Sequence, residues 1–519
     1  MFASVYENEA GAAAAPIQGG SSYQRRQPEN TVLYQMIADE FSTFREEVFE
    51  LGGGHELPGF VLQEFERYLD CGILARGFAR VRCATCRKEI LVGFSCKGRG
   101  ICPSCGARRM HDIAAHLVDR ILPSAPYRQW VLSFPKWLRV HIARDPCLAK
   151  QVQNIFQASI FVWQRKKARE KGVEGELGVG SVVFSQRFGD SLNLNFHFHA
   201  IVPDGIFIKQ GNDAMFCRLP FPKDTDIEWI TIRILRKIRR LLEKREFQEQ
   251  RDMDHSSKGY GHAMDMLTQL ALQHAGSENH QVPYKVSRSK LSVFIEGFSL
   301  HAGTHVHQND RPGLEHLCRY GSRPAIAIYR LTKLEDGKYQ YSLKYPLRNG
   351  SYKLILTGQE LMRRLALLVP RPRIHLIRYF GVFASRSHWR ALIVPSNKNQ
   401  PSGCGKREPV SSSYPESVSH VPDLKLNANL SFNNHHTFND CFPVMPAEAP
   451  RQRHLDWASL LKRVYGDELL ICPHCGNKRS IIAFIEDPAV ARKILDHLGL
   501  DSTGPPRSKS RVPTQTCLF

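Results

Sequence analysis

The chain has 519 residues, of which 42% are hydrophobic, and its formal net charge is +21. This length favours roughly two to four folded units, and the hydrophobic content excludes a wholly disordered chain. A strongly basic balance indicates a polyanionic partner, which the phosphate backbone of a nucleic acid explains best. Because there is no apolar run of about 18 residues to cross a membrane and no signal peptide in the first 16 residues, we expect a cytoplasmic protein.

Residues 1–30 are rich in Ala, Gly, Ser and Gln, and this composition predicts a disordered N-terminus. From Thr31 to Leu69 the apolar residues recur at helical spacing, with a break at the three glycines 52–54. We therefore predict a helical start to a first domain, which extends over residues 31–125.

Two Cys-x-x-Cys pairs follow within this domain. Fifteen residues separate the pairs, a spacing typical of four-thiolate zinc sites in proteins that are not secreted. We predict one structural zinc ion, and we expect the additional thiols Cys71 and Cys96 to be buried cysteines or a substitute ligand. The four predicted ligands are Cys83, Cys86, Cys102 and Cys105.

Basic residues accompany the cysteines and recur on a helix predicted within residues 227–251. Both groups are candidate DNA contacts, because nucleic-acid-binding modules cluster Lys and Arg on one face. A zinc unit used only for folding or protein contact, and a solvated helix surface, remain the alternatives. The candidates are Arg99, Arg108 and Arg109 in the first group and Arg236, Lys237, Arg239 and Arg240 in the second.

Residues 192–202 alternate polar and apolar side chains, which predicts a β-strand. Successive strand residues point to opposite faces, so His197 and His199 share one face and Phe198 lies on the other. Two imidazoles on a rigid strand can bind a metal and leave most of its coordination sphere open, which suits a metal that polarises a phosphate. A structural or incidental histidine pair is the alternative.

Tyr320 is the candidate nucleophile. Pro312 fits the first turn of a short helix and Gly321 supplies a stop, so the helix ends at the tyrosine. Arg319 and Arg323 flank the phenol and can hold a scissile phosphate. A phenol titrates near 10, so a neighbouring cation or metal has to favour phenolate before it attacks at neutral pH. The chain contains sixteen tyrosines, and the pattern alone leaves the others open.

The C-terminal part begins with residues 396–450, which have little periodicity and are interpreted as a linker after a domain at 126–395. A short unit at 451–500 contains a third Cys-x-x-Cys pair, Cys472 and Cys475, a possible second zinc site. This pair has no obvious cysteine partner, so a metal there requires His474 or a distant residue. Residues 501–519 are predicted to form a disordered tail.

Several motifs together resemble the HUH-type rolling-circle transposases of the insertion sequence 91 family, in their ISCR-like branch. The similar stretches cover nearly everything from 71 to 500 except the linker. They are Phe94–Cys105, Ser185–Gly189 leading into the histidine strand, Leu314–Tyr320, Leu368–Arg373, Arg378–Ala384 and the terminal Cys-Pro-His-Cys-Gly at 472–476.

The resemblance implies an α+β fold: an HUH nuclease domain with a central antiparallel β-sheet flanked by helices, preceded by a small zinc-binding domain. The histidine pair would lie on a central strand of this sheet. Gln186 lies one strand earlier, across the turn at 189–191, so it could reach the metal as a third ligand or be only a polar neighbour.

The resemblance also implies a transposase, an enzyme of DNA recombination that binds, nicks and rejoins single-stranded DNA at the ends of a mobile element and at its target. In this family two histidines hold a divalent ion, here expected to be Mg²⁺ or Mn²⁺, and a tyrosine forms a 5′-phosphotyrosine. Many relatives have two tyrosines four residues apart, but His316 occupies the position four before Tyr320. The chain therefore resembles the single-tyrosine form, located in a bacterial-type cytoplasm with the nucleoid.

Two other functions are compatible with these residues. The first is a plasmid or phage replication initiator or a relaxase with the same chemistry, against which the fused zinc unit argues. The second is a decayed, non-catalytic zinc DNA-binding protein, which the irregular stretch 396–450 favours.

Overall fold

The computed structural model describes residues 25–252, 287–394, 441–443 and 470–511, apart from Asn212 and Arg348. Disorder was predicted for residues 1–30: residues 1–24 lie outside these ranges, whereas residues 28–30 form a 3-10 helix with Pro28 buried. Most of the predicted linker and residues 512–519 also lie outside the described ranges. Within the described ranges, no helix is both long enough and apolar enough to cross a membrane.

The N-terminal unit is helical and includes a small β-hairpin. Thr31 caps its first helix, because its side chain accepts from the N–H of Tyr34, and that helix ends at Leu51, directly before the predicted glycine break. Both features agree with the sequence prediction. The elements are η2 (Pro28–Asn30), α1 (Val32–Leu51), α2 (Gly59–Asp70), η3 (Leu74–Arg76), β1 (Phe78–Cys83), β2 (Glu89–Gly93) and α3 (Pro103–Arg120).

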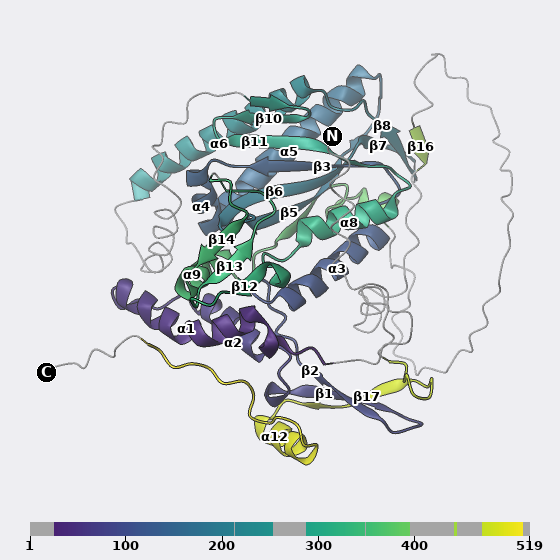
Figure 1. The fold of residues 1–519 in the computed structure, drawn as a ribbon. Coiled ribbons are helices and arrows are strands. Elements are labelled where there is room, and N and C mark those ends of the chain that lie inside the picture. The colour runs from purple at the N-terminus through teal and green to yellow at the C-terminus, as the bar shows by residue number, and fades with distance from the viewer. Residues whose placement is uncertain are drawn as a thin grey trace.

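The centre of the molecule is a seven-stranded sheet in the order β15-β5-β6-β3-β11-β10-β9, with antiparallel pairing throughout (Figure 1). The predicted α+β fold with a central antiparallel sheet is confirmed. The strands are β3 (Tyr127–Ser133), β5 (Gly180–Phe188), β6 (Leu194–Pro203), β9 (Ser287–Ser289), β10 (Ser292–Ile295), β11 (Phe298–Val306) and β15 (Ile377–Gly381).

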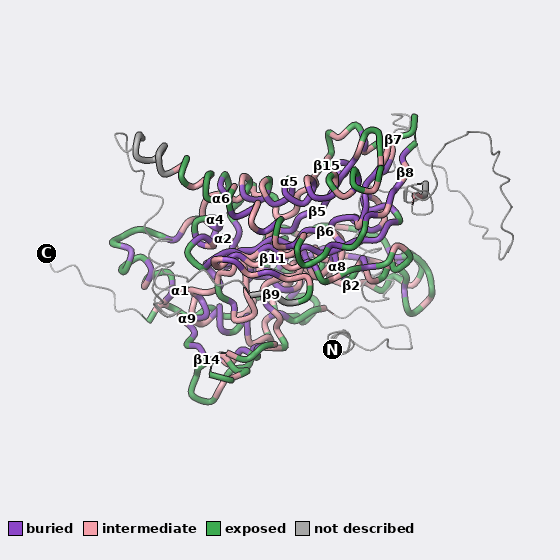
Figure 2. The backbone as a smooth tube through the Cα atoms, turned by 90° about the horizontal axis from the view of Figure 1, so that it is seen from above, coloured by how far each residue is buried: buried purple, intermediate pink, exposed green. Residues whose placement is uncertain are grey.

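Helices cover both faces of this sheet, so its central strands are buried (Figure 2). On one face, Phe198 packs with apolar side chains of three helices, α4 (Lys136–Arg144), α5 (Pro146–Glu170) and α6 (Asp224–Asp252). On the other face, Phe184 and Ile201 pack with α3 and with α8 (Arg311–Ser322). The alternation of β6 therefore separates an aromatic core from the face that holds the histidines.

Smaller elements surround the sheet. A four-stranded sheet flanks β6, a three-stranded sheet packs beside α1, and α12 lies at the C-terminal end of the described chain. These elements are β4 (Leu177–Gly178), β7 (Gly205–Gln210), β8 (Asp213–Arg218), β16 (Cys441–Pro443), η4 (Ile328–Arg330), β12 (Leu331–Lys333), β13 (Tyr339–Ser342), β14 (Lys353–Leu356), α9 (Gly358–Leu368), α10 (Arg390–Ile393), β17 (Arg479–Ile485) and α12 (Pro488–His497).

The C-terminal segment docks on the N-terminal unit. β17 is the third strand of a sheet with β1 and β2, and Ala491 and Leu495 of α12 are fully buried in the core that includes α1, α2 and α9 (Figure 1). Residues 501–511 continue along α2 and α1. Arg507 pairs with Asp70 of α2 at 2.6 Å, the Ser508 hydroxyl donates to Asp39 of α1, and the N–H of Arg511 donates to the Thr43 hydroxyl of α1. The prediction of a separate C-terminal unit and a disordered tail differs from this arrangement, because composition and periodicity do not reveal pairing with a strand about 400 residues earlier.

Candidate active site and cysteine clusters

The two histidines of β6 lie together on the face covered by α8. Their ring centroids are 4.8 Å apart, whereas Phe198 between them points into the opposite core. Both imidazoles are almost fully buried, and this burial lowers the pKa of His197 to about 4 and that of His199 well below its usual value. Both rings are therefore neutral at neutral pH, the state in which an imidazole can bind a metal.

Neighbouring groups orient each ring. In its neutral form His197 donates from Nδ1 to the carbonyl oxygen of Asn195 at 2.7 Å, which leaves Nε2 with the lone pair. The Nδ1 of His199 lies 3.2 Å from Nε2 of Gln129 on β3. A 180° rotation of this amide exchanges Nε2 and Oε1; in that orientation Oε1 accepts from Nδ1–H, and the lone pair of His199 is on Nε2 as well.

Gln186 lies opposite His197 in the β5–β6 ladder and therefore on the same face of the sheet. Its Nε2 donates to the carbonyl oxygens of Tyr320 and Gly321 at 2.8 and 2.9 Å. These carbonyls belong to the last turn of α8, which has no helical partners for them. Gln186 thus fastens the end of α8 to the sheet.

Tyr320 lies in this last turn, and its ring meets that of His199 edge-on at 5.5 Å between centroids. The guanidinium carbon of Arg323 is 4.6 Å from the centroid of the Tyr320 ring. Arg319 lies in the same turn, and its Nε is buried with no hydrogen-bond partner among the described residues. The structure thus brings Tyr320, the two histidines and Arg323 into one site.

Gly321 has a different role from the predicted helix stop, because α8 continues to Ser322. A Cβ at this position would lie 2.8 Å from the ring of Phe184 on β5. Glycine is required here for close approach of the helix to the sheet, and this approach brings Tyr320 to His199. Tyr329, the next tyrosine along the chain, is 73% exposed and does not reach the histidines.

The predicted DNA contacts are not gathered at this site. Arg99 donates to the carbonyls of Arg371 and Ile374, and Arg109 donates to the carbonyl of Lys97, so both guanidiniums bind the protein itself. Arg108 is exposed on α3.

The basic residues of α6 are on the other side of the sheet. Ile234 and Ile238 bury the apolar face of this helix in the core that contains Phe198. The basic face therefore points away from the histidines. Arg236, Arg239 and Arg240 are exposed, Lys237 is half-buried, and Arg239 pairs with Glu296.

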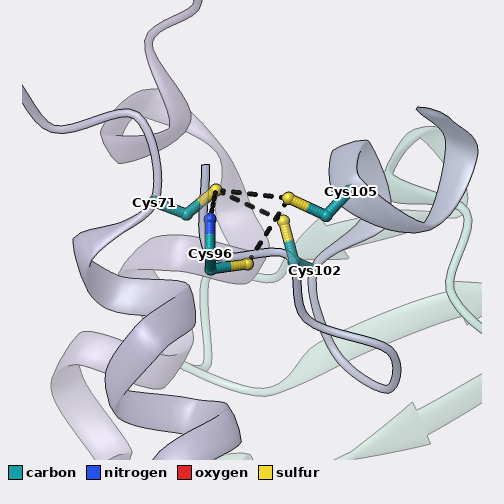
Figure 3. Close-up of side chains that lie close together, drawn as sticks. All are labelled: Cys71, Cys96, Cys102 and Cys105. Atoms are coloured by element: carbon teal, nitrogen blue, oxygen red, sulfur yellow. Dashed lines mark hydrogen bonds between the residues drawn. The ribbon is translucent and has the colours of Figure 1, made fainter. Parts of the chain in front are cut away.

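The cysteines form two clusters of four, and neither is the predicted set. In the first cluster, near the start of α3, four sulfurs converge (Figure 3). The Sγ of Cys105 is 3.6 Å from that of Cys71 and 3.4 Å from that of Cys96, and the Sγ of Cys102 is 3.7 Å from that of Cys71. Tetrahedral zinc with four thiolates places the sulfurs about 3.8 Å apart, so this geometry fits a closed structural site.

The second cluster combines the pair Cys83 and Cys86 with the C-terminal pair Cys472 and Cys475. The Sγ atoms of Cys83 and Cys475 are 3.4 Å apart, and those of Cys86 and Cys472 are 3.5 Å apart. The predicted set of Cys83, Cys86, Cys102 and Cys105 is therefore wrong. The spacing rule assumes that two successive pairs share one ion, but the β1–β2 hairpin holds the first pair away from the start of α3, where the second pair lies. The exposed His474 is not part of the cluster.

Sequence reasoning missed Gln129, the partner of His199, and it left open whether Cys71 and Cys96 are ligands or only buried cysteines. The signal for Gln129 was a second polar residue, directly after Arg128, in a strand whose remaining residues up to Leu132 are apolar. For the cysteines the signal was their number. One site of four thiolates left two further pairs unassigned, Cys71 with Cys96 and Cys472 with Cys475.

Comparison with known proteins agrees with this architecture. A family model described as "Putative transposase" matches residues 180–390, and one described as "Transposase zinc-binding domain", of the insertion sequence 91 type, matches residues 37–134. The chain is 23% identical over 324 residues to "Putative transposase y4qJ" of Sinorhizobium fredii (strain NBRC 101917 / NGR234), which covers 61% of this chain and 72% of that protein. No solved structure matches the chain.

The two matches follow the order seen in the fold, a zinc-binding unit and then the sheet with the histidines. The zinc-binding-domain match and the two cysteine clusters support structural zinc. The transposase match implies that the protein binds and processes DNA. The two family models and the relative together fit a transposase of the insertion sequence 91 family with an N-terminal zinc-binding domain.

Proposed function

We propose that this transposase cuts and rejoins single-stranded DNA through a covalent tyrosine intermediate, in rolling-circle transposition. Tyr320 is the nucleophile, and His197 and His199 hold a divalent cation beside it. The observation that carries the proposal is the placement of the Tyr320 ring 5.5 Å from that of His199, with the guanidinium of Arg323 against the phenol ring.

Unpartnered atoms in the site fit a cation. His199 Nε2 and Gln186 Oε1 are both buried and have no hydrogen-bond partner among the described residues. A buried polar atom without a partner costs free energy, of about 1–3 kcal/mol, so such atoms in one site indicate an absent ligand. His197, His199 and the oxygen of Gln186 would hold Mg²⁺ or Mn²⁺, which would polarise the scissile phosphate when bound.

The chain's own residues account for the covalent step. The Tyr320 Oη attacks the phosphorus and gives up its proton as the bond to the 3′ oxygen breaks, and that oxygen takes up a proton. The products are a 5′-phosphotyrosine and a free 3′-OH, and attack by a 3′-OH on the phosphotyrosine reverses the step. Arg319 and Arg323 bind the phosphate oxygens and offset their negative charge as the new bond forms.

A single tyrosine performs each cleavage in this proposal. His316, four residues before Tyr320, is exposed and replaces the second tyrosine of other relatives. One covalent adduct per chain is expected.

A nicking assay on single-stranded DNA with Mg²⁺ tests the proposal. Wild-type protein should form a covalent protein–DNA adduct, and peptide mapping should place it on Tyr320. An adduct on Tyr329, or cleavage at the wild-type rate by Tyr320→Phe, would refute the assignment.

A further inference from the structure

The second cysteine cluster joins the two ends of the described chain. Cys83 and Cys475 are separated by 392 positions, yet their sulfurs are 3.4 Å apart. The zinc-binding-domain match ends at residue 134 and therefore contains only half of this cluster. The zinc-binding-domain match therefore does not account for this cluster.

The two turns that present these cysteines have the same backbone structure. In each turn, the N–H of the first cysteine (position i) donates to the carbonyl of residue i+5. The N–H of residue i+4 donates back to the carbonyl of that cysteine. The residue at that fourth position has a positive φ in both turns, 56° and 72°. The hydrogen bonds are Cys83 to Lys88 and Arg87 to Cys83 in one turn, and Cys472 to Asn477 and Gly476 to Cys472 in the other.

Each turn therefore has the backbone of a metal-binding knuckle, and each supplies two of the four sulfurs of a tetrahedral site.

Contacts away from the sulfurs hold the two knuckles face to face. β17 pairs with β1 from Phe78↔Ile485 to Cys83↔Arg479, so the ladder ends at the cluster. The ring of Phe484 stacks on that of Phe94 at 6.5 Å. The guanidinium of Arg479 also lies 3.9 Å from Cys472 Sγ, where its charge favours a bound thiolate.

We propose that Cys83, Cys86, Cys472 and Cys475 bind a second structural zinc ion, which fastens the C-terminal segment 470–511 to the N-terminal unit. Four soft thiolates in a closed set select zinc over Mg²⁺ or Mn²⁺. The ion closes a loop of several hundred residues that includes the whole central sheet. The first cluster, built from residues 71–105, holds its own ion independently.

Metal analysis of the full-length protein tests the count. Wild type should contain about two zinc ions per chain, and Cys472→Ser/Cys475→Ser should contain about one. Cys147→Ser is the matched control, since Cys147 is exposed and outside both clusters, and it should retain both ions. One ion in wild type, or two in the double variant, would overturn the proposal.

Thiol labelling of the wild type tests which cysteines share an ion and requires no variant. During slow extraction by a chelator, four cysteines should become reactive to iodoacetamide together as each ion leaves. Peptide mapping should find Cys83 and Cys86 labelled in the same molecules as Cys472 and Cys475. Labelling of the C-terminal pair while Cys83 and Cys86 stay protected would show that the two knuckles do not share a metal.

Discussion

The histidine site on the central sheet and the second cysteine cluster are assembled in opposite ways. In the sheet, Gln186, His197 and His199 come from one β5–β6 hairpin, and Tyr320 and Arg323 come from the end of the distant helix α8. In the cluster, equal halves come from segments nearly 400 residues apart. Strand periodicity fixes the geometry of a site within one hairpin, whereas the partner of an isolated Cys-x-x-Cys pair depends on which strands the tertiary fold brings together.

The two regions should also differ in how they respond to substitutions. The histidine face is rigid because β6 is buried between two helical layers, so a small displacement of α8 changes the distance to Tyr320. The second cluster lies at the edge of a three-stranded sheet, where loss of a ligand releases one segment. Substitutions in the sheet should therefore affect chemistry, and those in the cluster should affect docking.

The largest effect is expected from Tyr320→Phe, which removes only the phenol oxygen. Cleavage and the covalent adduct should fall below detection, because no nucleophile remains, while single-stranded DNA binding stays close to wild type. Gel-shift titration and a denaturing gel for the adduct measure the two properties. A matched Tyr329→Phe variant should behave as wild type, since that ring is exposed and far from the histidines.

His197→Ala and His199→Ala should each lower the cleavage rate by roughly 10³-fold or more, because the divalent ion loses a ligand. The fold should persist, as both residues lie on a strand held by neighbours on each side. Rates measured over a range of Mn²⁺ concentrations, with circular dichroism as the control, check this. Cleavage by either variant that is fast and independent of added metal would contradict the assignment.

Gly321→Ala tests whether close approach of α8 to β5 sets the site. The new Cβ would lie 2.8 Å from the Phe184 ring, so we expect a loss of about 1–3 kcal/mol in the free energy of unfolding. Cleavage should fall by roughly 10–100-fold as Tyr320 moves. Adding Phe184→Leu should restore part of both quantities. Wild-type stability and rate in Gly321→Ala would mean that the contact does not position the tyrosine.

Gln129→Leu should weaken metal binding at the histidines by about 10–100-fold, because His199 loses the group that fixes its ring. Gln129→Glu keeps an acceptor for Nδ1–H and should retain affinity. The measurement is the Mn²⁺ concentration at half-maximal cleavage, compared with the melting temperature of each variant. If Gln129→Leu and Gln129→Glu raise this Mn²⁺ concentration equally, Gln129 acts through packing rather than through the hydrogen bond.

The smallest effect is expected from Arg236→Gln/Arg240→Gln on α6. These side chains lie across the sheet from the histidines, so the cleavage rate at saturating DNA should not change. If they contact phosphates, the slope of log affinity against log salt should decrease by about one to two units. An unchanged slope would show that the basic face of α6 is solvated and does not contact phosphates.

Elements that depend on local periodicity could be predicted from the amino-acid sequence. It predicted the break after α1, the strand that presents His197 and His199, the helix that ends near Tyr320, and the family. These features follow from neighbours within a few residues, where backbone geometry alone fixes which side chains share a face. Zinc-binding cysteines were also recognisable, because the Cys-x-x-Cys spacing is a local property of one turn.

How these parts combine became visible in the folded chain. It paired Cys83 and Cys86 with Cys472 and Cys475, completed the other cluster with Cys71 and Cys96, and ordered residues 501–511 against α2 and α1. It also placed α6 on the far side of the sheet from the histidines. The physical reason is that strand pairing and helix packing between remote segments depend on the apolar surface that the whole chain buries, and spacing along the sequence contains no record of it.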